Sequence, residues 1–150
     1  MKAIKGKRAK INLDIKEIRT LPTLYNMVRD LRMTEQIFMT GIEINDAAAA
    51  KLHCPGIPYY LNCKPEKRQI RKKSGRQQLL KTLKESNAIG VNCNYKFCTR
   101  RLLTLLHANG YKLSIWTVDK IKDMRKYSKI GPDNITTRHP DTLKATLNKK

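Results

Sequence analysis

The chain has 150 residues, and 32 Lys or Arg against 12 Asp or Glu give it a formal net charge of +20 at pH 7. This length is enough for one domain with a sizeable core, and the sequence contains no run of eighteen or more apolar residues that would predict a transmembrane helix. Residues 1–6 are too short and too charged for a signal peptide, so we expect a soluble, cytoplasmic protein.

The chain opens with a predicted strand, helix and second strand. Residues 10–17 predict the first strand. We expect the helix that follows to be capped by Thr20 and opened by Pro22, and Val28 continues its apolar face. Residues 36–41 form the next candidate strand.

Four consecutive alanines, residues 47–50, mark the second predicted helix. Asn45 or Asp46 precedes them and supplies the N-cap, since short polar side chains accept hydrogen bonds from the first free N–H groups of a helix. The helix ends before a Pro-Gly pair, and residues 57–62 predict the third strand.

A basic stretch, residues 64–85, contains the third predicted helix. Leu79 and Leu83 recur at helical spacing and indicate its buried side. We expect Gly75 to interrupt or start this helix, because glycine is unfavourable inside one. Residues 88–92 then predict the fourth strand.

The last third of the chain contains two further strand and helix units. Residues 98–108 predict a helix with a broad leucine stripe, which Asn109 and Gly110 terminate. An apolar strand follows at residues 111–119, and after a polar helix the last strand lies at residues 134–137.

Six short strands that alternate with helices predict an α/β fold. Helices of roughly ten to fifteen residues between the strands favour parallel pairing through right-handed crossovers, since each helix returns the chain to the same end of the sheet. No linker divides the chain, so residues 1–150 predict one domain. The pattern alone leaves open an open doubly wound sheet or part of a closed barrel.

Three segments resemble strand motifs of a known family. Residues 11–17 read INLDIKE, residues 110–118 read GYKLSIWTV, and residues 133–141 read DNITTRHPD. They resemble the l-x-I-E-I-K, G-x-x-v-x-x-W-T-V and D-x-I-x-T-x-x-P-D motifs of the glycerophosphodiester phosphodiesterases. The resemblance implies a partial TIM (β/α) barrel of about six units, units three to eight, without the first two.

The motifs that the family carries on its first two strands do not occur in this sequence: a His-Arg pair, a Glu-x-Asp pair and a His-Asp pair. We therefore expect an N-terminally incomplete domain, from a truncated gene or an incomplete reading of one, with little or no activity. Six units cannot close an eight-stranded barrel, so a second copy of the chain or the missing N-terminal piece is expected to pair with the open edges.

The resemblance implies metal-dependent hydrolysis of a glycerophosphodiester to glycerol 3-phosphate and an alcohol, with calcium or magnesium as the cation. It places Asp14 at a metal-ligand position, Lys16 at the phosphate and Trp116 in the pocket for the glycerol portion. Asp14 replaces the family's Glu and reaches less far. Asp14 and Lys16 point to the same face of a strand, so they could instead pair with each other, and Trp116 could instead fill the core.

Three further residues follow predicted strands, where parallel barrels carry their sites. Asn92 and Asn94 could shape the pocket, and His139 is the one histidine of the three on this face, with a simple loop residue as its alternative interpretation. We expect His53 and His107 near helix ends, away from the site.

The cysteines lack zinc-site spacing and disulfide density, so we interpret them as structural thiols: Cys54, Cys63, Cys93 and Cys98.

Half of the net charge lies in one quarter of the chain. Residues 64–101 hold twelve Lys or Arg and two Glu, a net charge of +10. A solvated helix face is the simpler interpretation. The alternative is a noncatalytic protein that uses this segment to bind phosphates of nucleic acid or an anionic membrane.

Overall fold

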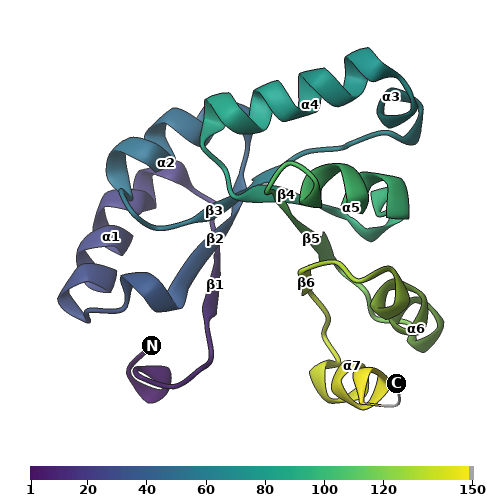
Figure 1. Ribbon diagram of the computed structural model, residues 1–150. Helices are drawn as coiled ribbons and strands as arrows, with labels where there is room; N and C mark the ends of the chain where they lie inside the picture. The colour runs from purple at the N-terminus through teal and green to yellow at the C-terminus, as the bar shows by residue number, and fades with distance from the viewer. Residues whose placement is uncertain (149–150) are drawn as a thin grey trace.

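The computed structural model describes residues 1–148, apart from the side chain of Lys2. Six parallel strands form one sheet, and their order in space follows their order in the chain. Figure 1 shows this sheet curling inside an arc of helices, as half of a (β/α) barrel does. The strands are β1 (Ile11–Asp14), β2 (Ile37–Ile42), β3 (Tyr59–Asn62), β4 (Gly90–Asn94), β5 (Lys112–Trp116) and β6 (Asn134–Ile135).

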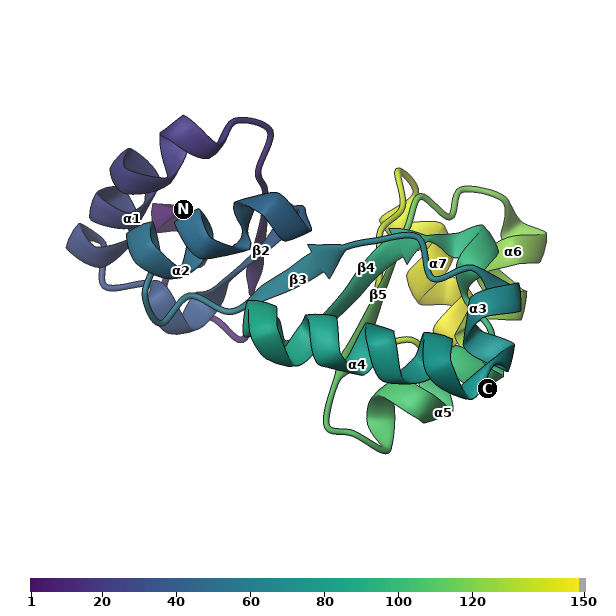
Figure 2. The same cartoon turned by 90° about the horizontal axis from the view of Figure 1, so that it is seen from above.

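Helices connect consecutive strands along the outside of the sheet. The helices are α1 (Leu21–Asp30), α2 (Ala47–His53), α3 (Lys67–Arg71), α4 (Lys73–Ser86), α5 (Arg100–His107), α6 (Ile121–Ile130) and α7 (Pro140–Leu147). Short 3-10 turns are η1 (Lys2–Ile4), η2 (Ile18–Thr20), η3 (Thr34–Gln36), η4 (Ile44–Asp46) and η5 (Tyr95–Phe97). Figure 2 shows α1 and α2 together at one end of the sheet, with α3, α6 and α7 toward the other.

Strand alternation separates an apolar face from a polar one. Met39, Leu61, Cys93 and Ile115 are at most 1% exposed and join one core with residues of the surrounding helices. Residues one position further along these strands face the concave side, because successive side chains of a strand point to opposite faces. Three of them are polar, Thr40, Asn62 and Asn94, and the fourth is Trp116. Two positions before Asn94 and Trp116, the polar residues Asn92 and Ser114 face the same side.

The parallel register aligns the polar residues into a row across four strands. Asn62 lies opposite Asn92, Asn92 opposite Ser114, and Ser114 opposite Asn134. Two side-chain hydrogen bonds follow from this row: Asn92 Nδ2 donates to Asn62 Oδ1 at 2.6 Å, and Asn134 Nδ2 donates to Ser114 Oγ at 2.9 Å. The concave face is thus held together by polar contacts.

The helix starts differ from the predicted capping at two positions. Thr20 does precede α1, but its hydroxyl donates to the Glu17 carbonyl at 2.7 Å instead of accepting from the helix. Asp46 precedes α2, also without a side-chain cap. In both places a 3-10 turn leads directly into the helix, so the capping residue already has helical backbone angles. Thr99 does cap α5, where it accepts from the backbone N–H of Leu102 at 3.1 Å.

The basic stretch forms two helices instead of one. The break falls at Lys72, whose extended backbone separates α3 from α4, and Gly75 lies in the first turn of α4. A Cβ atom at Gly75 would lie 2.2 Å from the carbonyl oxygen of Gln69. Glycine is therefore required here because α4 packs directly against the backbone of α3.

The structure confirms the predicted partial barrel and rules out the open doubly wound sheet, in which strand order departs from chain order. Within residues 1–148, β1 and β6 are the edge strands of the sheet, and each pairs with one neighbouring strand only. In this described part of the chain, no helix is long and apolar enough to cross a membrane.

The four cysteines are free thiols, and three of them are buried. Burial raises the pKa of Cys63 to about 12 and that of Cys98 to about 11, because an apolar environment disfavours the thiolate. A protonated, buried thiol behaves as a small apolar side chain. The geometry therefore agrees with the structural role expected from the sequence.

Candidate functional site

A cavity of about 330 Å³ opens at the carboxyl ends of the strands. In a parallel barrel the strand ends and the loops that follow them converge on this side. The cavity contains four of the strand-end candidates from the sequence, Asp14, Lys16, Asn92 and Trp116. Its complete lining is Asn12, Asp14, Lys16, Thr40, Asn62, Asn92, Trp116, Thr117 and Thr136.

Asp14 and Lys16 form an ion pair at the end of β1. The Lys16 Nζ lies 2.6 Å from Asp14 Oδ2, while the Thr40 hydroxyl lies 3.1 Å from both Asp14 Oδ1 and Asn12 Oδ1. The pairing that the sequence left as an alternative is therefore present. The side chains are 50% exposed for Asp14 and 78% for Lys16, so water screens the pair, and the ammonium stays accessible to a ligand.

Gly41 allows β2 to approach the chain that follows β1. Its φ of +85° lies in the left-handed region that favours glycine. A Cβ atom there would lie 2.2 Å from the Ile15 carbonyl oxygen and 3.0 Å from Asp14 Oδ1. Glycine at this position therefore leaves room for the Asp14 carboxylate at the edge of the cavity.

Two asparagines form the centre of the cavity wall, on β3 and β4. Asn62 Oδ1 accepts from Asn92 Nδ2 at 2.6 Å and from the Gly41 N–H at 3.4 Å. Because a backbone N–H can only donate, these contacts orient the amide groups of both side chains. Asn92 is 5% exposed, and its Oδ1 has no hydrogen-bond partner among residues 1–148.

Trp116 ends β5 on the far side of the cavity from Lys16. Its side chain is 39% exposed, so the indole lines the cavity and is not a buried core residue. Thr117, the next residue in the chain, and Thr136 line the same cavity. This wall therefore offers an apolar surface with hydrogen-bonding groups at its margin.

Two strand-end candidates lie outside this cavity. The Asn94 side chain instead accepts from the Lys96 N–H at 3.0 Å and caps η5. His139 is exposed and precedes α7. His107 lies at the end of α5, as expected, with its Nε2 2.9 Å from Asp133 Oδ2.

Sequence reasoning missed five residues of the lining. Two of them were foreseeable, because Asn12 lies two positions before Asp14 on the same strand face, and Asn62 ends the strand next to Asn92. Thr40, Thr117 and Thr136 carry no comparable signal, since threonine is common in strands whatever their function.

The donor groups of the described cavity do not fit a divalent cation on their own. Calcium takes six to eight oxygen ligands, and magnesium requires a near-octahedral set. Asp14 is the single carboxylate in the lining and is already paired with Lys16. Within residues 1–148, no group of three or more His, Cys, Asp or Glu side chains could hold a metal ion.

Comparison with known proteins identifies relatives of this chain. A model described as the glycerophosphoryl diester phosphodiesterase family matches residues 3–142. The chain is also similar to the dermonecrotic toxin LarSicTox-betaID1 of Loxosceles arizonica, with 33% identity over 78 residues, 49% of this chain and 27% of the toxin. The chain thus spans about a quarter of that toxin's length.

Solved structures share the fold. A putative glycerophosphodiester phosphodiesterase from Galdieria sulphuraria has a TM-score of 0.77 at 18% identity, over 97% of this chain and 60% of that one. A phosphodiesterase from Oleispira antarctica, in complex with the product sn-glycerol-3-phosphate, has a TM-score of 0.68 at 14% identity, over 93% of this chain and 55% of that one. Both are longer than this chain.

Proposed function

The chain belongs to the glycerophosphoryl diester phosphodiesterase family, and we propose that its strand-end cavity binds the phosphoryl and glycerol portions of a glycerophosphodiester. One observation carries this proposal: Lys16 and Trp116, which come from distant parts of the sequence, line a single cavity. One supplies a positive charge and the other an apolar surface, as a charged, hydroxylated small molecule requires.

Lys16 is the group that contacts the phosphate. It is the one Lys or Arg among the residues of the cavity lining. An ammonium group has three N–H donors, and one of them suffices for the 2.6 Å contact with Asp14. Two donors remain, and the side chain is 78% exposed. Lys16 can therefore contact a phosphate oxygen while it stays paired with Asp14.

Trp116 receives the glycerol portion. An indole ring packs well against C–H groups, and its exposed face in this cavity is free of the core. The hydroxyl groups of Thr117 and Thr136 line the same wall and can exchange hydrogen bonds with the glycerol hydroxyls. The cavity thus supports a charged end at Lys16 and a hydroxylated end at Trp116.

In this proposal, residues 1–148 bind a glycerophosphodiester but do not hydrolyse it. The family reaction, as the resemblance implies it, uses two histidines as acid and base and several carboxylates for a divalent cation. The lining contains no histidine and one carboxylate, Asp14. General acid and base catalysis contributes about 10² to 10⁴ in rate, so this set of residues supports recognition more than hydrolysis.

Calorimetric titration with glycerol 3-phosphate and glycerophosphocholine tests the proposal. We expect Lys16→Gln to weaken binding of both by about tenfold, since a hydrogen bond to a charged group contributes roughly 1.5 to 3 kcal/mol and exposure reduces that value. Lys51→Gln is the matched control, because Lys51 is exposed on α2 and outside the cavity. Equal affinity of the wild type and Lys16→Gln would overturn the assignment.

Turnover is measured in the same preparations as release of choline from glycerophosphocholine with calcium or magnesium present. We expect no release above the uncatalysed rate. Release that Asp14→Asn or Lys16→Gln abolishes would show instead that the chain is an enzyme as it stands.

A further inference from the structure

Two arginine side chains converge on one carbonyl group at the end of α3, and that carbonyl belongs to a third arginine, Arg71. Arg76 Nη1 donates to the carbonyl oxygen of Arg71 at 2.9 Å and lies 3.3 Å from that of Ile70. Arg101 Nη2 donates to the same Arg71 oxygen at 3.2 Å. The guanidinium groups of Arg76 on α4 and Arg101 on α5 therefore meet at the backbone of Arg71 on α3.

This cluster, Arg71, Arg76 and Arg101, is held together by a neutral acceptor. None of the ion pairs within residues 1–148 includes any of the three residues. Of the two glutamates in residues 64–101, Glu85 lies beside Lys81, and Glu66 is at the opposite end of α3. Like charges held close without a carboxylate repel one another, so an anion that contacts them would relieve this repulsion.

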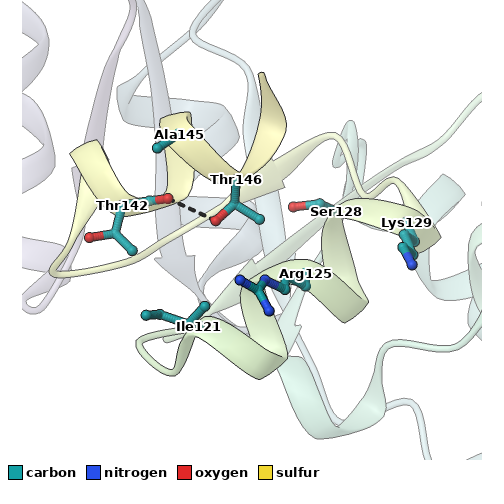
Figure 3. Close-up of a pocket in the computed structure, with 7 residues that line it drawn as sticks. All are labelled: Ile121, Arg125, Ser128, Lys129, Thr142, Ala145 and Thr146. Carbon is teal, nitrogen blue, oxygen red and sulfur yellow. Dashed lines mark hydrogen bonds between the residues drawn. The ribbon is translucent and has the colours of Figure 1, made fainter. Parts of the chain in front are cut away.

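A second contact extends the cluster toward α6. Arg100, the residue before Arg101, turns the other way and places its Nη2 3.4 Å from the carbonyl oxygen of Lys129 on α6. Lys129 and Arg125 line a cavity of about 340 Å³ between α6 and α7. Figure 3 shows the Arg125 guanidinium beside Ile121 at this cavity, with Thr142 and Thr146 of α7 across from it.

These contacts join α3, α4, α5 and α6 into one basic strip, defined by Arg71, Arg76, Arg100, Arg101, Arg125 and Lys129. Five of these six residues are arginines, whose planar forks match the geometry of phosphate oxygens. The part of the strip on α3, α4 and α5 is charged without being apolar, because no large apolar side chain within 64–101 is exposed. The α6 end differs, since the exposed Ile121 lies beside Arg125 there.

We propose that this strip binds the phosphate backbone of double-stranded nucleic acid without reading its sequence. A surface that enters a bilayer would present apolar side chains beside its charges along its length, whereas four of the six strip residues lie within residues 64–101, where no large apolar side chain is exposed. A surface that binds single strands would present aromatic rings for stacking, but Tyr95 and Phe97 are half-buried. A row of arginines on α3 and α5 suits repeated phosphates instead.

Fluorescence anisotropy of a labelled duplex, measured over a range of salt concentrations, tests this proposal. The test variant is Arg71→Gln with Arg101→Gln, which keeps Arg76 and its contacts with α3. Each lost phosphate contact lowers the slope of log affinity against log salt by about 0.9. We therefore expect the slope to fall by about 2 and the affinity near 0.1 M salt to fall on the order of 10²-fold.

Arg29→Gln with Lys51→Gln is the matched control. It removes the same charge from exposed positions on α1 and α2, at the opposite end of the sheet in Figure 2. We expect this control to change the slope little. Equal losses in both variants would show that net charge, and not the strip, attracts the duplex, and absence of binding at low salt would overturn the proposal outright.

Two further binding measurements distinguish nucleic acid from an anionic membrane as the ligand of the strip. DNA and RNA duplexes of the same sequence should bind with similar slopes, since both present a regular phosphate backbone. Vesicles of phosphatidylcholine with phosphatidylserine should bind less than the duplexes. Variant-sensitive binding to vesicles without binding to duplexes would assign the strip to a membrane. The glutamine variant could also lose binding because it is less stable, which a lower melting temperature than that of the wild type would reveal. In that case Arg71→Lys with Arg101→Lys replaces it. We expect this lysine variant to keep the slope of log affinity against log salt and to bind the duplex severalfold more weakly.

Discussion

Lys16 and Trp116 line the same cavity although three strands of the sheet stand between β1, which Lys16 follows, and β5, which ends at Trp116. The parallel direction of the strands places both residues at the same edge of the sheet, and the curvature of the sheet brings the two strand ends toward each other. A flat sheet would hold the two residues apart. Several consequences of this arrangement can be measured.

Asp14→Asn and Lys16→Gln should change anion binding in opposite directions. The Asp14 carboxylate lies 2.6 Å from the Lys16 ammonium and offsets its charge. Removing the carboxylate should tighten binding of glycerol 3-phosphate by about threefold, a modest effect because both side chains are exposed to water. Calorimetry on the two variants measures this, and weaker binding by Asp14→Asn would show that the carboxylate itself holds the ligand.

Calcium and magnesium should leave the melting temperature of this chain unchanged. The cavity offers one carboxylate, already paired. A cation bound at a hundred times its dissociation constant would stabilise the fold by about 2.7 kcal/mol, which thermal unfolding detects readily. A rise in melting temperature with either ion, lost in Asp14→Asn, would restore Asp14 as a metal ligand.

Gly41→Ala should destabilise the fold more than Gly56→Ala. Both glycines have positive φ, +85° and +80°, so alanine is strained at either position. At Gly41 the new Cβ would also lie 2.2 Å from the Ile15 carbonyl oxygen, whereas at Gly56 nothing lies within 4 Å. We expect an additional loss of about 1 to 3 kcal/mol for Gly41→Ala in denaturant unfolding. Equal losses would contradict the close approach of β2 to β1.

The fold should lose stability above pH 9. Burial raises the pKa of Cys63 to about 12 and of Cys98 to about 11 from an ordinary value of 9.0. The unfolded chain therefore releases these protons first as pH rises, so stability is complete below pH 9 and is lost progressively toward the folded pKa values. Melting temperatures at pH 8 and pH 10.5 measure this, and Cys63→Ala should reduce the difference.

The fold could largely be read from the sequence because its signals are local. Strand spacing, the leucine stripe of α5 and the terminal glycines of helices depend on neighbouring residues, and each predicted strand is present. The capping of α1 by Thr20 was wrong, because a 3-10 turn determines the backbone there. Gly75 correctly indicated the start of a helix, since it lies in the first turn of α4. The separate helix α3 and the break at Lys72 were not predicted, because they depend on how α3 packs against α4.

The cavity was less accessible to sequence reasoning. Position after a strand correctly placed Asp14, Lys16, Asn92 and Trp116 in it, since strand ends converge in parallel sheets. The same rule also selected Asn94, whose side chain turns back to cap η5. Which strand-end residue enters the cavity depends on the loop that follows, and loop conformation has little signal in one sequence.

Trp116 is the single tryptophan of the chain, so its fluorescence reports on this cavity alone, and titration with glycerol 3-phosphate is the most direct test of the proposed site. We expect a saturable change in emission, and we expect Lys16→Gln to require a much higher ligand concentration for the same change. Emission that stays constant while calorimetry detects binding would place the ligand elsewhere and contradict the account.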